Sequence, residues 1–361
     1  MRVPRNRRKA YVAFSALLVF LASCGGTPTE SSATTEAEPS ATTEAEPSAT
    51  TEAAEPSTTT EAAELIPVSM RLDHQPYPLH VGFYGAKEMG WYEEVGLDVS
   101  IGVGQGSSST AQLVGAGEDD FGLVAGNIVV TAVGEGLPIK MVGGILADSG
   151  TCLMVLADNV PTPQDLVGKT IGSDPGGAST PLIEPYLTAI GIDPTTVTMQ
   201  GVDNEAETTS LLEGQLDAVT SLSTLEPIEL RIQQGINTDC FLFSEAGLTL
   251  IGHGIITNDT MIAEQPEVVR SFVEASVRGY QYLVDNPDDA ADLFVDLIGH
   301  EVGYEQELSR ATLEATVPNF TDPLGVLTEE QWLTTIDILE THLGLEDLPG
   351  PTDVYVADFY P

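Results

Sequence analysis

Three loop segments carry polar groups that could hold a small molecule without making or breaking a covalent bond. Two of them precede predicted helices, where free backbone N–H groups and serine hydroxyls can donate hydrogen bonds to a ligand. The alternative for each of these two is that the loop only caps its helix. The candidates in the first loop are His74, Gln75 and His80; those in the second are Ser107 and Ser108; and those in the third are Gly176, Gly177 and Ser179. Asn127, outside these loops, is a further candidate.

Sequence signatures of catalysis are scarce. The chain has no GxSxG, HExxH, CxxC or Walker motif, and 104–110 reads GQGSSST rather than a dinucleotide-binding pattern. The five histidines lack metal-ligand spacing, although His74 and His80 fall in one segment. A lone histidine is more often a hydrogen-bonded structural group than a ligand. We therefore expect a binding protein rather than an enzyme, with no catalytic residue, no metal and no cofactor.

The charge of the chain narrows the class of partner. The first 64 residues hold 5 basic and 9 acidic residues, so 65–361 keeps 8 of the 13 basic and 46 of the 55 acidic ones, a formal charge of −38. Nucleic acid is excluded as a partner because its binding requires a basic surface. No EF-hand spacing accompanies the acidic residues, so we interpret them as a solvated surface rather than a cation site.

The N-terminal segment has the organisation of an export signal. Four arginines and Lys9 precede the apolar run 10–22, which ends in Leu-Ala-Ser-Cys at Cys24. A membrane-spanning helix needs about 20 apolar residues, so this run is too short. Leu-Ala-Ser-Cys resembles the lipobox of bacterial lipoproteins, in which the cysteine is lipidated. We expect a signal peptide over 1–23 and a lipid on Cys24 that anchors the exported protein to the outer face of the cell membrane. An ordinary signal peptide is the alternative, and Sec or twin-arginine export stays open.

The segment after Cys24 has the composition of a tether. Residues 34–41 and 42–49 both read TTEAEPSA, and 50–57 is the near copy TTEAAEPS. Such a sequence buries too little apolar surface to offset the entropy of ordering. We expect 24–64 to be a disordered stalk that holds a globular body away from the membrane.

Short apolar runs alternate with helical periodicity along the body. This alternation predicts parallel sheets covered by helices. The predicted strands cover 97–103, 121–124, 138–146, 152–157, 169–173, 197–202, 217–222 and 249–257, and the predicted helices between them include 180–190 and 205–213. Pro266 opens a long predicted helix, and Thr328 to Gln331 has the capping-box pattern of another that runs to about His342.

Cys152 and Cys240 remain beyond Cys24, and both lie in apolar runs. Two thiols in an exported protein can form a disulfide. Because buried free thiols are common in such strands, we favour free thiols and leave the pairing open.

Motifs spread over 70–361 are each weak and together specific. They are LDHQP from Leu72, HVGFYGAK from His80, then 90–92, 96–99, 165–172, 212–218, 322–325, Trp332 and 355–361. With these motifs the chain resembles the extracytoplasmic solute-binding proteins of ABC importers. The resemblance is to the branch for pyrimidine precursors of thiamine, within the family for sulfonates, nitrate and thiamine precursors.

The resemblance implies a fold and a domain organisation. The fold is α/β and two-lobed, of the type II periplasmic-binding-protein-like kind, with each lobe a mostly parallel sheet flanked by helices. Lobe 1 would comprise 65–156 and 257–361, and lobe 2 would comprise 157–256, because the second-lobe motifs at 165–218 are nested between segments typical of the first lobe. The ligand would lie between the lobes, at strand ends and helix starts.

The resemblance also implies a function. The protein would be a lipid-anchored, monomeric binding component that delivers a small heterocycle, such as a thiamine pyrimidine precursor, to an ABC permease. Glu226 aligns with a glutamate that relatives use on an aminopyrimidine edge, where a carboxylate accepts two hydrogen bonds. The alternative for Glu226 is an acid at a helix N-terminus.

Departures from the family leave the ligand open. His74 stands where relatives have a ring-stacking tryptophan, and Thr224 and Leu225 replace aromatic residues before Glu226. A flavin-like heterocycle, a sulfonate and nitrate are the alternative ligands. The enzymatic alternative is a pyrimidine synthase of the same fold, which we disfavour because it carries a Cys-Cys-Cys-Phe-Cys run that is absent here.

Overall fold

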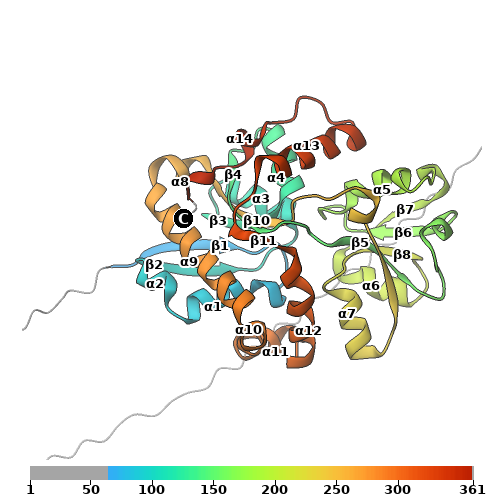
Figure 1. Ribbon diagram of the computed structural model, residues 1–361, viewed down its shortest axis with the longest axis horizontal. Coiled ribbons are helices and arrows are strands. Elements are labelled where there is room, and N and C mark those ends of the chain that lie inside the picture. The colour runs from blue at the N-terminus through green and yellow to red at the C-terminus, as the bar shows by residue number, and fades with distance from the viewer. Residues whose placement is uncertain (1–63, 360–361) are drawn as a thin grey trace, which may run out of the picture. The chain divides into compact units, whose positions relative to one another are not determined.

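The computed structural model describes residues 64–359, which belong to one compact unit with two β-sheets. Figure 1 shows the six-stranded sheet on the left, in the order β11-β4-β10-β3-β1-β2, and the five-stranded sheet on the right, in the order β7-β6-β8-β5-β9. The strands of the first sheet are β1 (Ile66–Arg71), β2 (Leu97–Gly102), β3 (Phe121–Ala125), β4 (Ile139–Leu146), β10 (His253–Asn258) and β11 (Phe320–Gly325). Those of the second are β5 (Thr151–Leu156), β6 (Thr170–Ser173), β7 (Thr198–Gly201), β8 (Ala218–Leu222) and β9 (Thr238–Leu242).

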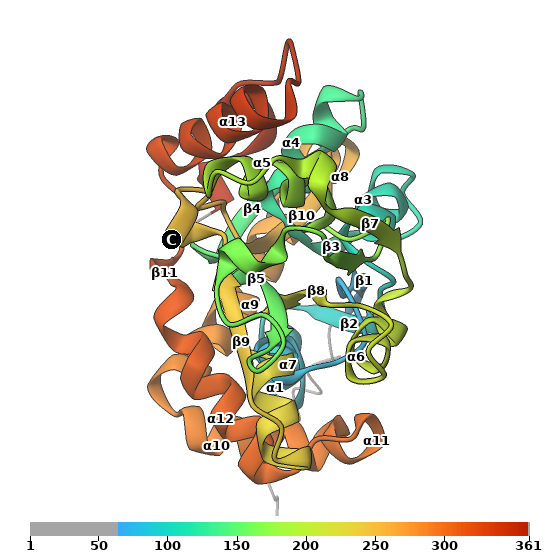
Figure 2. The same cartoon turned by 90° about the vertical axis from the view of Figure 1, so that its right-hand side faces the viewer.

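Helices flank both sheets. Figure 2 views the unit from the side of the five-stranded sheet, with α5, α6 and α7 among the helices of that half. The α-helices are α1 (Val81–Glu88), α2 (Trp91–Glu94), α3 (Ser107–Gly115), α4 (Gly126–Gly134), α5 (Ile183–Ala189), α6 (Asn204–Leu212), α7 (Glu226–Glu229), α8 (Asp259–Glu264), α9 (Pro266–Asp285), α10 (Pro287–Phe294), α11 (His300–Val302), α12 (Gln306–Thr316), α13 (Glu329–Leu343) and α14 (Pro351–Val354).

The predicted strands are confirmed, with ends shifted by one residue in seven of the eight. The eighth, predicted over 249–257, begins only at His253 as β10. The predicted capping box is also confirmed at the start of α13. The Thr328 side chain accepts a hydrogen bond from the Gln331 backbone N–H at 3.2 Å, and the Gln331 side chain accepts one from the Thr328 N–H at 2.8 Å.

Both sheets are mixed rather than mostly parallel. β1 pairs in parallel with β2 and β3, and β6 pairs in parallel with β7 and β8. In contrast, β10 is antiparallel to β3 and β4, and β5 is antiparallel to β8 and β9. The chain enters the second sheet with the antiparallel strand β5 and returns to the first sheet with the antiparallel strand β10. Each of these strands has a neighbouring strand on both sides.

The chain passes between the sheets twice. It leaves the first sheet after β4 through 147–150 and returns to β10 through 243–252. β5 falls within 65–156, the segment predicted for lobe 1, yet it pairs in the five-stranded sheet. The sheet membership therefore favours lobe boundaries somewhat earlier than 156 and 257, and the boundaries themselves stay a prediction.

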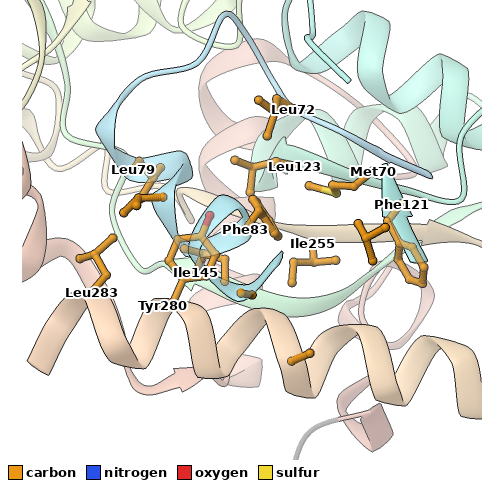
Figure 3. Packing of buried hydrophobic residues seen from close by; sticks show 14 of the residues in the cluster. Met70, Leu72, Leu79, Phe83, Phe121, Leu123, Ile145, Ile255, Tyr280 and Leu283 are labelled. Carbon is orange, nitrogen blue, oxygen red and sulfur yellow. The ribbon is translucent and has the colours of Figure 1, made fainter. Parts of the chain in front are cut away.

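The core of the six-stranded half forms against α9. Pro266 begins this helix, as predicted, and Phe272, Tyr280 and Leu283 are fully buried on one face of it. Figure 3 shows Tyr280 and Leu283 on the side of α9 that faces the sheet residues. A Cβ atom at Gly279 would lie 1.9 Å from the backbone oxygen of Gly82, so α1 and α9 can approach this closely only because Gly279 lacks a side chain.

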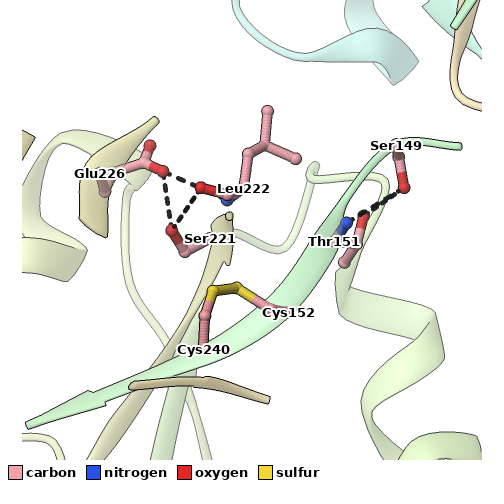
Figure 4. The surroundings of a disulfide bond; sticks show 7 residues. All are labelled: Ser149, Thr151, Cys152, Ser221, Leu222, Glu226 and Cys240. Carbon is pink, nitrogen blue, oxygen red and sulfur yellow. Dashed lines mark hydrogen bonds between the residues drawn. A yellow bond between two sulfur atoms is a disulfide. The ribbon is translucent and has the colours of Figure 1, made fainter. Parts of the chain in front are cut away.

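Cys152 and Cys240 form a disulfide, so our preference for free thiols was wrong. The two residues are diagonal neighbours on the antiparallel strands β5 and β9, with Cα atoms 5.5 Å apart. This separation is within the usual range for a disulfide. The sequence could not show that these distant runs pair side by side. Cys152 also lies opposite Ser221 of β8, and Figure 4 shows the disulfide close to the hydrogen bonds between Ser221 and Glu226.

Two predictions concern the N-terminal part of the chain. The signal peptide, the lipidated Cys24 and the stalk up to residue 63 lie outside the described residues. Within 64–359, no helix combines the length and the apolar character required to cross a membrane.

Candidate functional site

A cavity of about 130 Å³ lies where loops from both sheets meet. The six-stranded half contributes groups from the loop after β1, from the start of α3 and from β10. The five-stranded half contributes the loop after β6, the start of α6, the end of β8 and the start of α7. The lining residues are Asp73, His74, Tyr77, Gly106, Ser107 and His253 from the first half, and Asp174, Gly177, Ala178, Ser179, Asn204, Glu207, Thr220, Ser221, Leu222, Leu225 and Glu226 from the second.

On the first half, a buried network is centred on Asp73. The His80 Nδ1 accepts a hydrogen bond from the Tyr77 backbone N–H at 3.2 Å, so the proton of the neutral ring is on Nε2, which donates to Asp73 Oδ1 at 2.7 Å. The His253 Nε2 lies 3.2 Å from Asp73 Oδ2. Tyr77 Oη donates to the same oxygen at 3.3 Å.

This network keeps Asp73 ionised. Burial alone would raise the pKa of Asp73, but the electrostatic attraction of the His253 and His80 imidazoles and their hydrogen bonds outweigh it and hold the pKa well below its usual range. Burial lowers the pKa of His80 and outweighs the opposing effect of Asp73, which favours the neutral ring. The network therefore positions His253 with Nε2 on the carboxylate, while Nδ1 is buried and has no hydrogen-bond partner within the described residues.

On the second half, Glu226 is held at the start of α7. Its Oε2 accepts hydrogen bonds from the Ser221 hydroxyl at 2.8 Å and from the Leu222 backbone N–H at 3.2 Å (Figure 4). The other oxygen, Oε1, makes no hydrogen bond to the described part of the chain. One carboxylate oxygen is thus fixed by the protein, and the other remains available to a ligand in the cavity.

Glu207 is a second buried carboxyl group of the cavity. It is 3% exposed, with Oε1 accepting from the Asp174 backbone N–H at 2.7 Å and Oε2 accepting from the Thr220 hydroxyl at 2.9 Å. Burial, with further contributions from the charges of Glu226 and Asp174, raises the pKa of Glu207 to about 8 despite these hydrogen bonds. At neutral pH the group is therefore protonated in most molecules.

The loop after β6 uses part of its own hydrogen-bonding capacity. The Gly176 N–H donates to Asp174 Oδ1 at 2.8 Å, and the Gly177 N–H donates to the Asp174 backbone oxygen at 2.9 Å. The Thr180 hydroxyl also donates to that backbone oxygen. Because these backbone N–H groups already donate within the loop, they are not free to bind an anion.

The structure brings half of the predicted site residues to the cavity. His74, Ser107, Gly177, Ser179 and Glu226 line it. Their contact with a ligand stays a prediction.

The other five predicted residues lie elsewhere. Gln75 and Gly176 are both exposed and are not among the lining residues. His80 is fully buried behind Asp73. Ser108 lines a separate hollow beside α4. Asn127 donates from Nδ2 to the Ala178 backbone oxygen at 2.8 Å and thereby joins the two halves.

Several cavity residues were missed from the sequence. Asp73 belongs to the LDHQP motif and could have been included. Glu207 gave one usable signal, since it stands four residues before the buried Leu211 and hence on the inward face of α6. His253 gave none, because it lies at the start of a strand that is buried at every position.

Comparison with known families decides the membership of the chain. A profile of the family described as NMT1/THI5 like matches residues 77–290. The chain belongs to this family. The resemblance inferred from the motifs is thereby confirmed.

Individual relatives include both binding proteins and enzymes. The chain is 28% identical over 292 residues to the formylaminopyrimidine-binding protein of Halalkalibacterium halodurans, covering 79% of this chain and 88% of that protein. It is 30% identical over 247 residues to the riboflavin-binding protein RibY of Chloroflexus aurantiacus, covering 66% and 68%. It is 26% identical over 237 residues to a 4-amino-5-hydroxymethyl-2-methylpyrimidine phosphate synthase of Legionella pneumophila, covering 63% and 72%.

Among solved structures, the fold is similar to that of the alkanesulfonate-binding protein SsuA of Xanthomonas axonopodis pv. citri bound to MOPS. The TM-score is 0.66 with 15% sequence identity, and the alignment covers 82% of this chain and all of that one, 100%. At this identity the likeness shows the fold alone, and it confirms the predicted periplasmic-binding-protein-like α/β class.

Proposed function

We propose that the protein is the solute-binding component of an ABC importer and that it captures a small nitrogen heterocycle, such as a pyrimidine precursor of thiamine. It is exported and held at the outer face of the membrane by a lipid on Cys24. The family membership and the two relatives named as binding proteins support this class. The signal-like sequence before Cys24 supports the export and the anchor.

The charge of the cavity is the observation that carries the choice of ligand. Four of the lining side chains are carboxyl groups, those of Asp73, Asp174, Glu207 and Glu226, and none of the lining residues in the described part of the chain is lysine or arginine. A sulfonate or nitrate would meet these carboxylates without a compensating cation. A heterocycle with amino groups supplies the hydrogen-bond donors that the carboxylates accept.

The residues that contact the ligand in this proposal are those of the predicted set that line the cavity. Glu226 accepts a hydrogen bond from an amino group of the heterocycle through its free Oε1. His74 lies against the ring, and Ser107, Gly177 and Ser179 contribute polar groups at its edge. His80 is a positioning residue, acting through Asp73, and Asn127 joins the two halves rather than contacting the ligand.

The enzymatic alternative receives less support. Relatives named as pyrimidine phosphate synthases share the family. None of the described residues that line the cavity is a cysteine, however, and Cys152 and Cys240 are joined as a disulfide. A binding role requires only the hydrogen-bonding groups already present.

The two sheets are the centres of two lobes in this proposal, with 147–150 and 243–252 as the crossings, and the lobes close on the ligand. The bond from Asn127 to Ala178 spans the two halves and supports a closed arrangement. Small-angle scattering of the protein should show a smaller radius of gyration when a verified ligand saturates it. An unchanged radius would contradict closure.

Titration calorimetry of the purified protein tests the function. The panel comprises 4-amino-5-hydroxymethyl-2-methylpyrimidine, its formylamino counterpart, riboflavin, an alkanesulfonate and nitrate. We expect saturable binding of at least one heterocycle and none of the oxyanions. Binding of nitrate or a sulfonate, with no heterocycle bound, would refute the proposed ligand class.

A further inference from the structure

Glu207 is held so that its carboxyl group faces the cavity. Its two oxygens accept hydrogen bonds from separate segments, the Asp174 N–H after β6 and the Thr220 hydroxyl of β8. With both oxygens anchored, the group cannot turn away to solvent. Each oxygen retains a second lone pair that can accept from a ligand.

The surroundings of Glu207 carry an excess of negative charge. Asp174 and Glu226 stand beside it on the second half, and Asp73 faces it from the first half with the imidazoles of His74 and His253. No lysine or arginine lines this space in the described chain. The raised pKa of Glu207, about 8, follows from burial and from Glu226 and Asp174. A proton on Glu207 therefore serves as the counter-charge while the cavity holds no ligand.

An independent feature of the same cavity also points to a ligand. His253 is 6% exposed and lines the cavity, and its buried Nδ1 has no hydrogen-bond partner in the described residues. Leaving a buried polar atom without a partner costs free energy. A ligand group in the cavity would supply that partner.

We propose that the cavity selects a positively charged heterocycle, such as a pyrimidine that carries an ammonium group, and that Glu207 pairs with the charge while Glu226 holds the ring. This inference rests on the proposed function and names the charge of its ligand. When the cation binds, Glu207 gives up its proton to the solvent and becomes a carboxylate. The ammonium group keeps its three protons and donates to Glu207, so charge is balanced in the occupied cavity.

Two probes that differ in one substituent test the inference by calorimetry. They are 4-amino-5-aminomethyl-2-methylpyrimidine, which carries the ammonium group, and its neutral 5-hydroxymethyl counterpart. We expect the cation to bind about tenfold or more tightly at neutral pH. Its affinity should rise between about pH 6 and about pH 7.5, and buffers of different ionisation enthalpy should report proton release.

Two glutamine variants assign the effect to Glu207. Glu207→Gln keeps both anchoring hydrogen bonds, because the amide accepts from Asp174 and donates to the Thr220 hydroxyl, and it should abolish the proton release and most of the preference for the cation. Glu205→Gln is the matched control, since it makes the same substitution at a glutamate of the same helix that is exposed and does not line the cavity. Glu205→Gln should leave the proton release and the preference for the cation unchanged.

The outcomes separate the inference from the function. Equal binding of the two probes, or an undiminished preference in Glu207→Gln, would overturn the inference and leave the proposed function standing. Failure of both probes to bind would overturn the inference; the proposed function would stand if another heterocycle of the panel binds and would fall if none does.

Discussion

Replacing Glu226 by glutamine keeps the size of the side chain and changes one acceptor into a donor. Oε2 of Glu226 receives hydrogen bonds from Ser221 at 2.8 Å and Leu222 at 3.2 Å, and Oε1 accepts from the ligand in the proposed complex. If the glutamine oxygen stays on Ser221 and Leu222, its NH₂ group meets a donor of the ligand. If the amide flips, the NH₂ group meets the Leu222 N–H instead. Both orientations leave a buried mismatch.

The size of the effect follows from that mismatch. An unmatched buried hydrogen-bonding group costs about 1–3 kcal/mol, and each 1.4 kcal/mol is about tenfold in affinity. Glu226→Gln should therefore weaken binding of an amino heterocycle roughly tenfold to a hundredfold. Titration calorimetry with the tightest heterocycle of the panel measures this, and circular dichroism checks that the variant is folded.

Glu229→Gln is the matched control, because Glu229 belongs to the same helix and is not among the cavity-lining residues. It removes the same charge and should leave the affinity nearly unchanged. An oxyanion ligand predicts the opposite sign for Glu226→Gln, since the loss of a nearby carboxylate would relieve repulsion and strengthen binding. Unchanged affinity in Glu226→Gln would refute the placement of Glu226 in the site.

Three further predictions concern the anchor, the disulfide and the pH dependence of stability. Cys24→Ala should move the protein from the membrane fraction to the soluble fraction, and a variant that stays in the membrane with its apolar run intact would exclude the lipid as the anchor. Replacing Cys152 and Cys240 together by alanine opens a loop of 88 residues and should lower the free energy of unfolding by about 4–5 kcal/mol in the chain-entropy description, so an unshifted denaturant midpoint would contradict it. The pKa of Glu207 is raised from 4.5 to about 8, so the folded state binds the extra proton and the unfolding free energy of the ligand-free protein should fall as the pH rises through that interval. In Glu207→Gln the difference in unfolding free energy between pH 5 and pH 8 should be smaller, by a few kcal/mol at most, as measured by denaturant titrations at the two pH values.

The sequence predicted the fold well where burial is continuous. β3 is buried at every position, and its apolar run could be recognised without knowledge of its neighbours. β11 was missed because its sequence, FTDPLG, interrupts the apolar pattern with polar residues and proline, and β9 was missed because the apolar run in TDCFL is short. Their pairing depends on strands that are distant in the chain, which a local pattern does not contain.

The site was predictable by segment and not by side chain. The LDHQP turn was expected at the cavity, yet its inward carboxylate is Asp73, while the neighbouring Gln75 is exposed and His80 supports Asp73 from behind. Glu207 becomes a cavity group only because Asp174 and Thr220, from two other segments, hold its carboxyl in place. Such arrangements are set by tertiary contacts. The resemblance could not predict them, because the relatives have aromatic residues at positions where this chain has His74, Thr224 and Leu225.

The disulfide between Cys152 and Cys240 also determines how the chain transmits tension. The bond joins the strand that enters the five-stranded sheet to a strand near its exit, across 88 residues. A pull on the two ends of the polypeptide therefore passes from β5 to β9 through the sulfur atoms, and the intervening segment bears none of the load. Those residues form a hidden length of roughly 300 Å, at about 3.3–3.6 Å per extended residue. A single-molecule stretching experiment would release that length only after a reductant has cleaved the bond.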